Sequence, residues 1–118
     1  MRTRALNFGL YADEQGLAWA RGLVEEAVRS RSARVVRETV AHTVFGSELT
    51  TADAYEFLAE QWACEHPGQS SGAREPVELC VYLACSLSTW RAIRKAVIKA
   101  LCPQGAEPHA CRVPWIAA

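Results

Sequence analysis

Residues 77–87 form the most apolar stretch of the chain, and this stretch limits the folds that the chain can adopt. Glu78 is its one charged residue, and most other positions carry aliphatic, aromatic or cysteine side chains. Pro76, directly before it, is favoured at the first position of a helix. We therefore predict a helix from Pro76 to Leu87. A helix that is apolar on every side belongs in the middle of a core or at a subunit interface.

Four other segments also have helical signals. Asp13 is a suitable N-cap, and the apolar residues after it recur at the three-four spacing of a helix face. The segment after Ser32 contains valines four residues apart, which favours a helix, although β-branched residues also favour strands. The predicted helices span residues 13–30, 32–46, 50–66, 76–87 and 88–102.

The predicted fold class is all-α, a compact bundle of about five helices packed around the fourth. The chain has 118 residues, of which 50% are hydrophobic and 22% charged, as is typical of one globular domain. We predict a single helical domain over residues 1–102. Several prolines and a glycine follow, so residues 103–118 are predicted as an irregular tail that docks on the body.

Charge and hydropathy exclude some classes of protein. Thirteen basic residues balance thirteen acidic ones, so there is no overall attraction to nucleic acid or anionic lipid. No stretch approaches the roughly 20 apolar residues of a membrane span, and the first residues make a poor signal peptide. We therefore expect a cytoplasmic protein with no membrane partner.

The segment from Glu78 to Leu101 resembles the general helix-turn-helix pattern. Apolar residues fill the positions at which two helices cross, but Ala84 stands where the turn usually has glycine. The resemblance implies that the second helix would face DNA. The same pattern also fits an ordinary helical hairpin with a solvated basic face. The residues that would contact DNA are Ser88, Thr89, Arg91, Arg94 and Lys95.

Two predicted helices carry opposite charges. The helix over 50–66 has four acidic residues and no basic ones, whereas the helix over 88–102 has four basic residues and no acidic ones. The two helices could flank a shared apolar seam within one molecule, set the geometry of a dimer, or each face solvent.

No constellation of residues predicts catalysis. Cys64 and His66 could join His109 and Cys111 around a zinc ion, but their spacing does not fit known zinc modules. No glycine-rich phosphate loop and no local cysteine–histidine signature is present. We expect no metal, no cofactor, no catalytic residue and no enzymatic activity.

The sequence therefore predicts a small regulatory or adaptor module. It would act by self-association, with a dimer expected, or by binding another protein through the helices near 76–101. The alternative is a helix-turn-helix regulator that binds DNA through the helix over 88–100. Exposed aromatic and aliphatic anchors dominate the energies of protein interfaces. The predicted partner-binding anchors are Leu83, Trp90, Ile93 and Val97.

Overall fold

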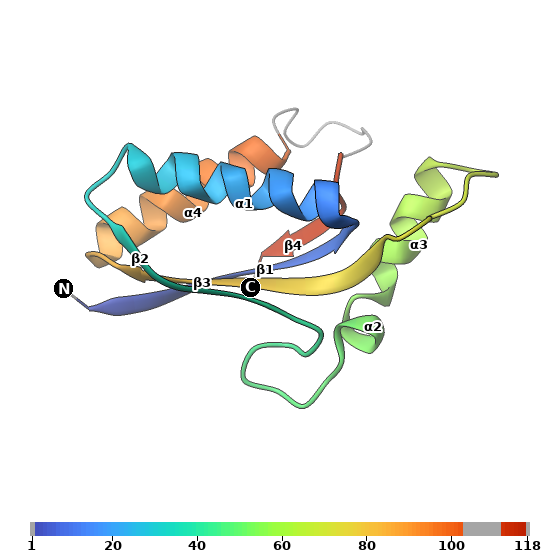
Figure 1. Cartoon of the computed structure of the whole chain (residues 1–118), viewed down its shortest axis with the longest axis horizontal. Helices are drawn as coiled ribbons and strands as arrows, with labels where there is room; N and C mark the ends of the chain where they lie inside the picture. The colour runs from blue at the N-terminus through green and yellow to red at the C-terminus, as the bar shows by residue number, and fades with distance from the viewer. Residues whose placement is uncertain (1, 103–111, 118) are drawn as a thin grey trace.

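A computed structural model describes residues 2–102 and 112–117, and it shows a four-stranded antiparallel sheet rather than a helical bundle. The prediction of an all-α fold is wrong. Two long helices cover one face of the sheet, and two short helices cover part of the other face (Figure 1). The elements are β1 (Thr3–Ala12), α1 (Glu14–Arg29), β2 (Arg34–Ala41), α2 (Thr51–Ala54), α3 (Glu56–Glu65), β3 (Glu75–Ala84), α4 (Leu87–Leu101) and β4 (Trp115–Ala117).

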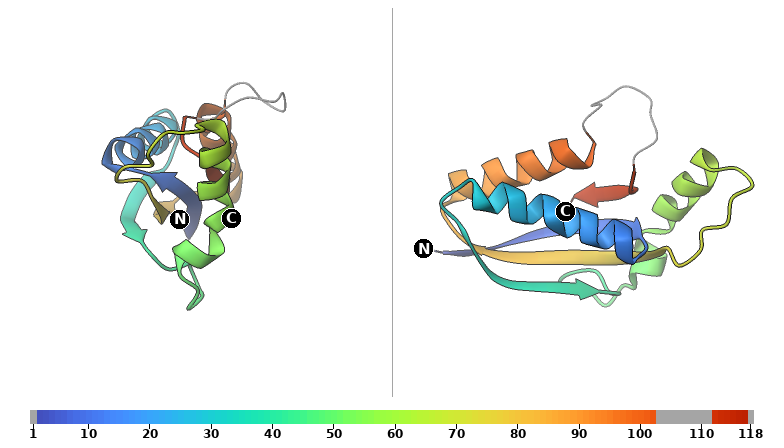
Figure 2. Two further views of the ribbon diagram at one scale, coloured as in Figure 1. Left: turned by 90° about the vertical axis from the view of Figure 1, so that its right-hand side faces the viewer. Right: turned by 45° about the horizontal axis from the view of Figure 1, so that its top comes forward.

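The strand order is β2-β3-β1-β4, and each neighbouring pair is antiparallel. The connection from β1 through α1 to β2 passes over β3, and the connection from β3 through α4 to β4 passes over β1. Apart from the α2–α3 insertion, this is the β-α-β-β-α-β arrangement of ferredoxin-like folds. Figure 2 shows α1 and α4 lying side by side above the sheet.

The apolar stretch that the sequence suggested as a helix is the central strand β3. Its odd-numbered residues from Val77 to Leu83 point to the covering helices and are at most 3% exposed. Its even-numbered residues face the opposite side, where Glu78 and Cys80 are also buried. A strand that is covered on both faces loses the alternation of polar and apolar residues, and periodicity alone cannot then distinguish it from a buried helix.

Three more segments differ from the predicted helical bundle. Residues 3–12, to which no element was assigned, form the ten-residue strand β1. The valines at 36 and 40 belong to the edge strand β2, as their β-branching favours, with a bulge between Val35 and Arg37. Residues 115–117, placed in an irregular tail, form β4 and pair with β1. Residues 103–111 of that tail lie outside the described part of the chain.

The other predicted helices are confirmed. Asp13 caps α1 by accepting a hydrogen bond from the backbone N–H of Gly16 at 2.8 Å. Thr50 caps α2 through the N–H of Asp53, and α3 follows after a break at Tyr55. The helix over 88–102 exists as α4, but its N-cap is Ser86 rather than Ser88.

Two clusters of apolar side chains stabilise the molecule. The larger lies between the sheet and the α1–α4 layer. The smaller lies on the opposite face, where Tyr11 of β1 packs against Tyr55, Leu58 and Trp62. Gly9 permits this second contact, because a Cβ atom there would lie 2.7 Å from the ring of Tyr55. The α2–α3 insertion thus covers only the part of the sheet nearest the end of β1.

Candidate protein-interaction site

Three of the four predicted partner-binding anchors lie inside the protein. Leu83 of β3 and Ile93 of α4 are 0% exposed, and Val97 of α4 is 1% exposed. They pack in the larger core cluster, because β3 runs through the centre of the sheet and α4 lies across it. A partner has no access to these three side chains in the folded chain. Trp90, the fourth, is half-buried at the edge of this core.

The helix-turn-helix unit does not form, because residues 75–84 are a strand. The residues proposed to contact DNA all lie on or beside the exposed surface of α4, but without the partner helix that the motif requires. Ser88, Arg91 and Lys95 are exposed, whereas Thr89 and Arg94 are half-buried.

A cavity opens beside Trp90, at the end of the molecule where the chain begins, and we call it the socket. Its volume is about 300 Å³, and Leu87 and Trp90 supply its apolar wall. The indole N–H of Trp90 donates to the carbonyl of Ala5 at 3.0 Å, which fixes the ring against β1. The lining residues are Arg2, Thr3, Arg4, Ala5, Leu87 and Trp90.

The strand register explains why the socket is open. β4 pairs only with Phe8–Leu10 of β1, so the first half of β1 has no neighbouring strand on that side within the described residues. Leu87 begins α4 directly after its cap, where the helix projects beyond the core, and its side chain is 40% exposed. Arg4 donates its Nε–H to the carbonyl of Cys85 at 3.3 Å, which holds its guanidinium near the cavity.

An exposed aromatic side chain lies at the opposite end of the molecule (Figure 1). Phe57 on α3 is 46% exposed, and the edge-to-face contact of its ring with Tyr55, at 6.5 Å between centroids, restricts its position. Exposed carboxylates lie one position before it and three positions after it, at Glu56 and Glu60, and Asp53 lies four positions before it. We call Phe57 with Asp53, Glu56 and Glu60 the acidic knob.

The sequence contained a signal for the acidic knob that the prediction missed. The buried stripe of this region is Tyr55, Leu58 and Trp62. Phe57 does not follow this helical spacing. Its side chain is therefore expected on the solvent-facing side of the helix, beside the acidic residues. Single exposed apolar residues are common, but an exposed phenylalanine flanked by carboxylates is suited to a basic apolar pocket.

Among the described residues, the charged side chains at the two ends make no ion pair. The ion pairs among the described residues are Arg21 with Glu38, Arg29 with Glu26, and His42 with Glu75. None of them involves the acidic knob, the socket or the basic residues of α4. The acidic and basic helices do not flank one seam within the molecule, because α3 packs in the smaller cluster with Tyr11 and α4 packs in the larger cluster on the other face of the sheet.

The described cysteines and histidines do not form a metal centre. Among residues 2–102 and 112–117, no group of three or more His, Cys, Asp and Glu side chains could hold a metal ion. His109 and Cys111, two of the four zinc ligands considered above, lie outside the described residues. Burial raises the pKa of the Cys80 thiol, which makes it a poor nucleophile at neutral pH.

None of the helices in the described ranges has the length and apolar character needed to cross a membrane. Comparisons of the chain with models of known protein families, with curated proteins and with solved structures give no match. The fold defines a small α/β protein, with the socket at one end and the acidic knob at the other.

Proposed function

We propose that this chain is a protein-interaction module that self-associates head to tail, with the acidic knob of one copy inserted in the socket of the next. The observation that carries the proposal is the complementarity of the two ends. One end presents an exposed phenylalanine among carboxylates, and the other presents a 300 Å³ apolar cavity bordered by Arg2 and Arg4. A regulatory or adaptor role would follow from this assembly.

The energetic contributions divide between burial and charge. Removing the ring of Phe57 from water stabilises the contact by about 25 cal/mol per Å² of apolar area, and aromatic anchors of this kind dominate interface energies. The carboxylates of Glu56 and Glu60 would meet Arg2, Arg4 or Arg91. Exposed ion pairs contribute only about 0–1 kcal/mol each, so their main effects are orientation and the rate of association.

The two surfaces differ from one another, which determines the type of assembly. A two-fold dimer would pair one surface with itself, whereas a knob and a socket form a heterologous contact. Repetition of such a contact gives a ring if the rotation closes and a filament if it does not. Because the knob and the socket lie near opposite ends of a molecule 48 Å long, copies joined end to end leave one knob and one socket free to bind further copies.

Sedimentation velocity tests this proposal. We expect the average sedimentation coefficient of the wild-type chain to increase with concentration, and to increase less when salt is raised from about 0.05 to about 0.5 M, because salt screens exposed charges. Phe57→Ser should weaken the association about thirtyfold, since loss of a central aromatic anchor costs about 2 kcal/mol or more.

A matched control distinguishes this specific contact from nonspecific hydrophobic association. Leu49 is 58% exposed, more than Phe57, but lies in the loop after β2 and outside both end surfaces. Leu49→Ser should leave the association unchanged. A wild-type chain that stays monomeric at all concentrations, or an equal loss in Leu49→Ser and Phe57→Ser, would contradict the proposal.

A further inference from the structure

The sheet face opposite α1 and α4 is only partly covered. The α2–α3 insertion covers the half near the end of β1, where the Tyr55 ring lies against Gly9. The other half carries three rows of residues that are set by the strand register. From the end of the sheet inwards these rows are Arg34–Ala84–Thr3, Arg37–Tyr82–Ala5 and Thr39–Cys80–Asn7. We call this region the open face.

The open face is basic. Arg34 and Arg37 are both exposed on it, and none of its nine residues is acidic. The nearest carboxylate in the next row belongs to Glu78, which is 2% exposed and accepts hydrogen bonds from Tyr55 and from the backbone N–H of Phe45. Glu38 points to the other face of the sheet, where it pairs with Arg21. An anion bound to the open face would therefore contact two arginines. None of the three rows contains an exposed carboxylate that would repel it.

Aromatic rings lie beside these arginines. The guanidinium of Arg37 is 5.9 Å from the centroid of the Tyr82 ring, and the ring of Phe45 meets Tyr82 edge to face at 6.3 Å. Phe45 is 52% exposed, although it belongs to the loop after β2 and could have turned into the core. Its backbone hydrogen bond to Glu78 instead holds the loop against the sheet. Ring and guanidinium surfaces of this type stack with nucleobases.

A polar group of the open face has no partner. The Oδ1 atom of Asn7 is buried, and no hydrogen bond to it is made by the described residues. Buried acceptors are normally satisfied, so this oxygen is one of two such exceptions among the side chains of the described residues, and its burial keeps it out of contact with a ligand on the open face.

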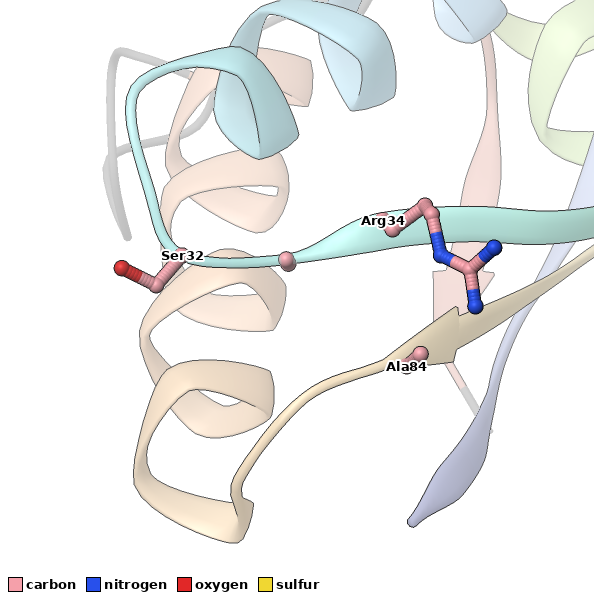
Figure 3. A pocket seen from close by; sticks show the side chains of 4 residues that line it. Ser32, Arg34 and Ala84 are labelled. Atoms are coloured by element: carbon pink, nitrogen blue, oxygen red, sulfur yellow. The ribbon is translucent and has the colours of Figure 1, made fainter. Parts of the chain in front are cut away.

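The end of the open face is hollowed. A cavity of about 420 Å³ is lined by Ser32, Ala33, Arg34 and Ala84. Figure 3 shows the guanidinium of Arg34 beside Ala84 on the neighbouring strand. The small side chains of Ala84, Ala5 and Thr3 leave the rest of this end flat. A flat surface does not enter a duplex groove, whereas unstacked bases can lie across it.

We propose that the open face binds single-stranded nucleic acid, with the arginines on phosphates and with Tyr82 and Phe45 on bases. The open face shares Thr3 and Ala5 with the lining of the socket, but neither Phe57 nor Leu87 belongs to it. The net charge of zero does not prevent the open face from binding nucleic acid, because the acidic residues of the knob lie at the other end of the molecule.

Fluorescence anisotropy with a labelled single-stranded RNA of mixed sequence, its DNA equivalent and the matching duplex tests the proposal. We expect wild type to bind a single strand at low salt and to prefer it to the duplex. Tyr82→Ala should weaken binding about tenfold, within the range for loss of one base stack, whereas Tyr82→Phe keeps the ring and should bind like wild type. Arg37→Ala should reduce the slope of log K against log salt by about 0.7, the value for one phosphate contact.

Two controls decide between this proposal and simpler explanations. Arg29→Ala removes the same charge from the exposed end of α1, away from the open face, and should leave binding unchanged. Phe57→Ser should also bind normally, which separates this site from self-association. The proposal is overturned if no single strand binds at low salt, or if Arg29→Ala loses as much affinity as Arg37→Ala. Displacement of the RNA by an equal concentration of polyglutamate would also overturn it, in favour of an acidic protein partner.

Discussion

Replacing Leu83 with alanine should lower the free energy of unfolding by about 2–5 kcal/mol, the range for truncating a fully buried leucine. Leu83 is 0% exposed on β3, opposite Arg4 of β1 and Val35 of β2. The loss has two parts. The removed atoms no longer contribute the free energy of hydrophobic burial, and the cavity that they leave costs further stability. Urea denaturation of the Leu83→Ala variant in a Leu87→Glu background, where self-association is blocked, measures the effect on the single chain.

The same variant distinguishes the observed fold from the predicted helical bundle. If Leu83 were an exposed anchor, its truncation would weaken association and leave the stability of the monomer almost unchanged. Leu49→Ala, at a side chain that is 58% exposed, provides the scale for a surface leucine and should change the stability by less than about 0.5 kcal/mol. Equal effects of the two substitutions would show that Leu83 does not lie in the core.

Glu78→Ala should destabilise the chain by about 3 kcal/mol. The Oε1 atom of Glu78 accepts a hydrogen bond from the hydroxyl of Tyr55 at 2.8 Å, and its Oε2 atom accepts one from the backbone N–H of Phe45. Burial, reinforced by the hydrogen bond and the charge of Glu78, raises the pKa of Tyr55, so the phenol remains a donor. Alanine would leave both donors without an acceptor, at about 1–3 kcal/mol for each buried group.

A double-mutant cycle with Tyr55→Phe tests whether this loss comes from the hydrogen bonds. Tyr55→Phe alone removes one of the two donors and should cost less than Glu78→Ala. After Glu78→Ala, the further loss of the Tyr55 hydroxyl should cost nothing or restore some stability, because that hydroxyl is already unpaired. Amide exchange at Phe45 should also accelerate in Glu78→Ala but not in Tyr55→Phe. Strictly additive energies would show that the two residues are not coupled.

The sequence predicted helices correctly where a cap and an amphipathic face occur together. Asp13 begins α1, and Thr50 begins α2, as their side chains indicated. α4 exists with the apolar seam of Ile93, Val97 and Leu101. In each of these helices one face packs against the core and the other faces solvent. The apolar residues therefore recur with the period of a helix, and the helix can be recognised from the sequence.

The strands were missed for a physical reason that differs from one strand to the next. β3 lies at the centre of the sheet, and its residues 77–81 are buried on both faces, so this part of the strand shows no period of two. β2 is an edge strand, and residues four apart share a face in a regular strand as well as in a helix, so the spacing of Val36 and Val40 did not distinguish the two. β1 has buried residues on both faces near Gly9. It pairs with residues of β3 that are 63 to 81 positions further along the chain, and local sequence patterns carry no information on such distant pairing.

The sequence indicated only some residues of the surfaces that we propose for self-association. Opposite charges on the segments 50–66 and 88–102 indicated complementary surfaces, and Trp90 does line the socket. The sequence could not show that Arg2 and Arg4 lie beside Trp90, because this proximity arises from the packing of α4 over β1. It also could not show that Leu83, Ile93 and Val97 are enclosed, because a core seam and an interface seam have the same composition.

A mixing experiment tests the head-to-tail contact most directly. Phe57→Ser removes the knob and keeps the socket, whereas Leu87→Glu introduces an acid into the socket and keeps the knob. Glutamate is also favourable in the first turn of a helix, so α4 should still form. In sedimentation velocity, we expect each variant alone to be monomeric and their equimolar mixture to form a dimer that grows no further. Association of either variant alone, or a mixture that remains monomeric where wild type associates, would contradict the account.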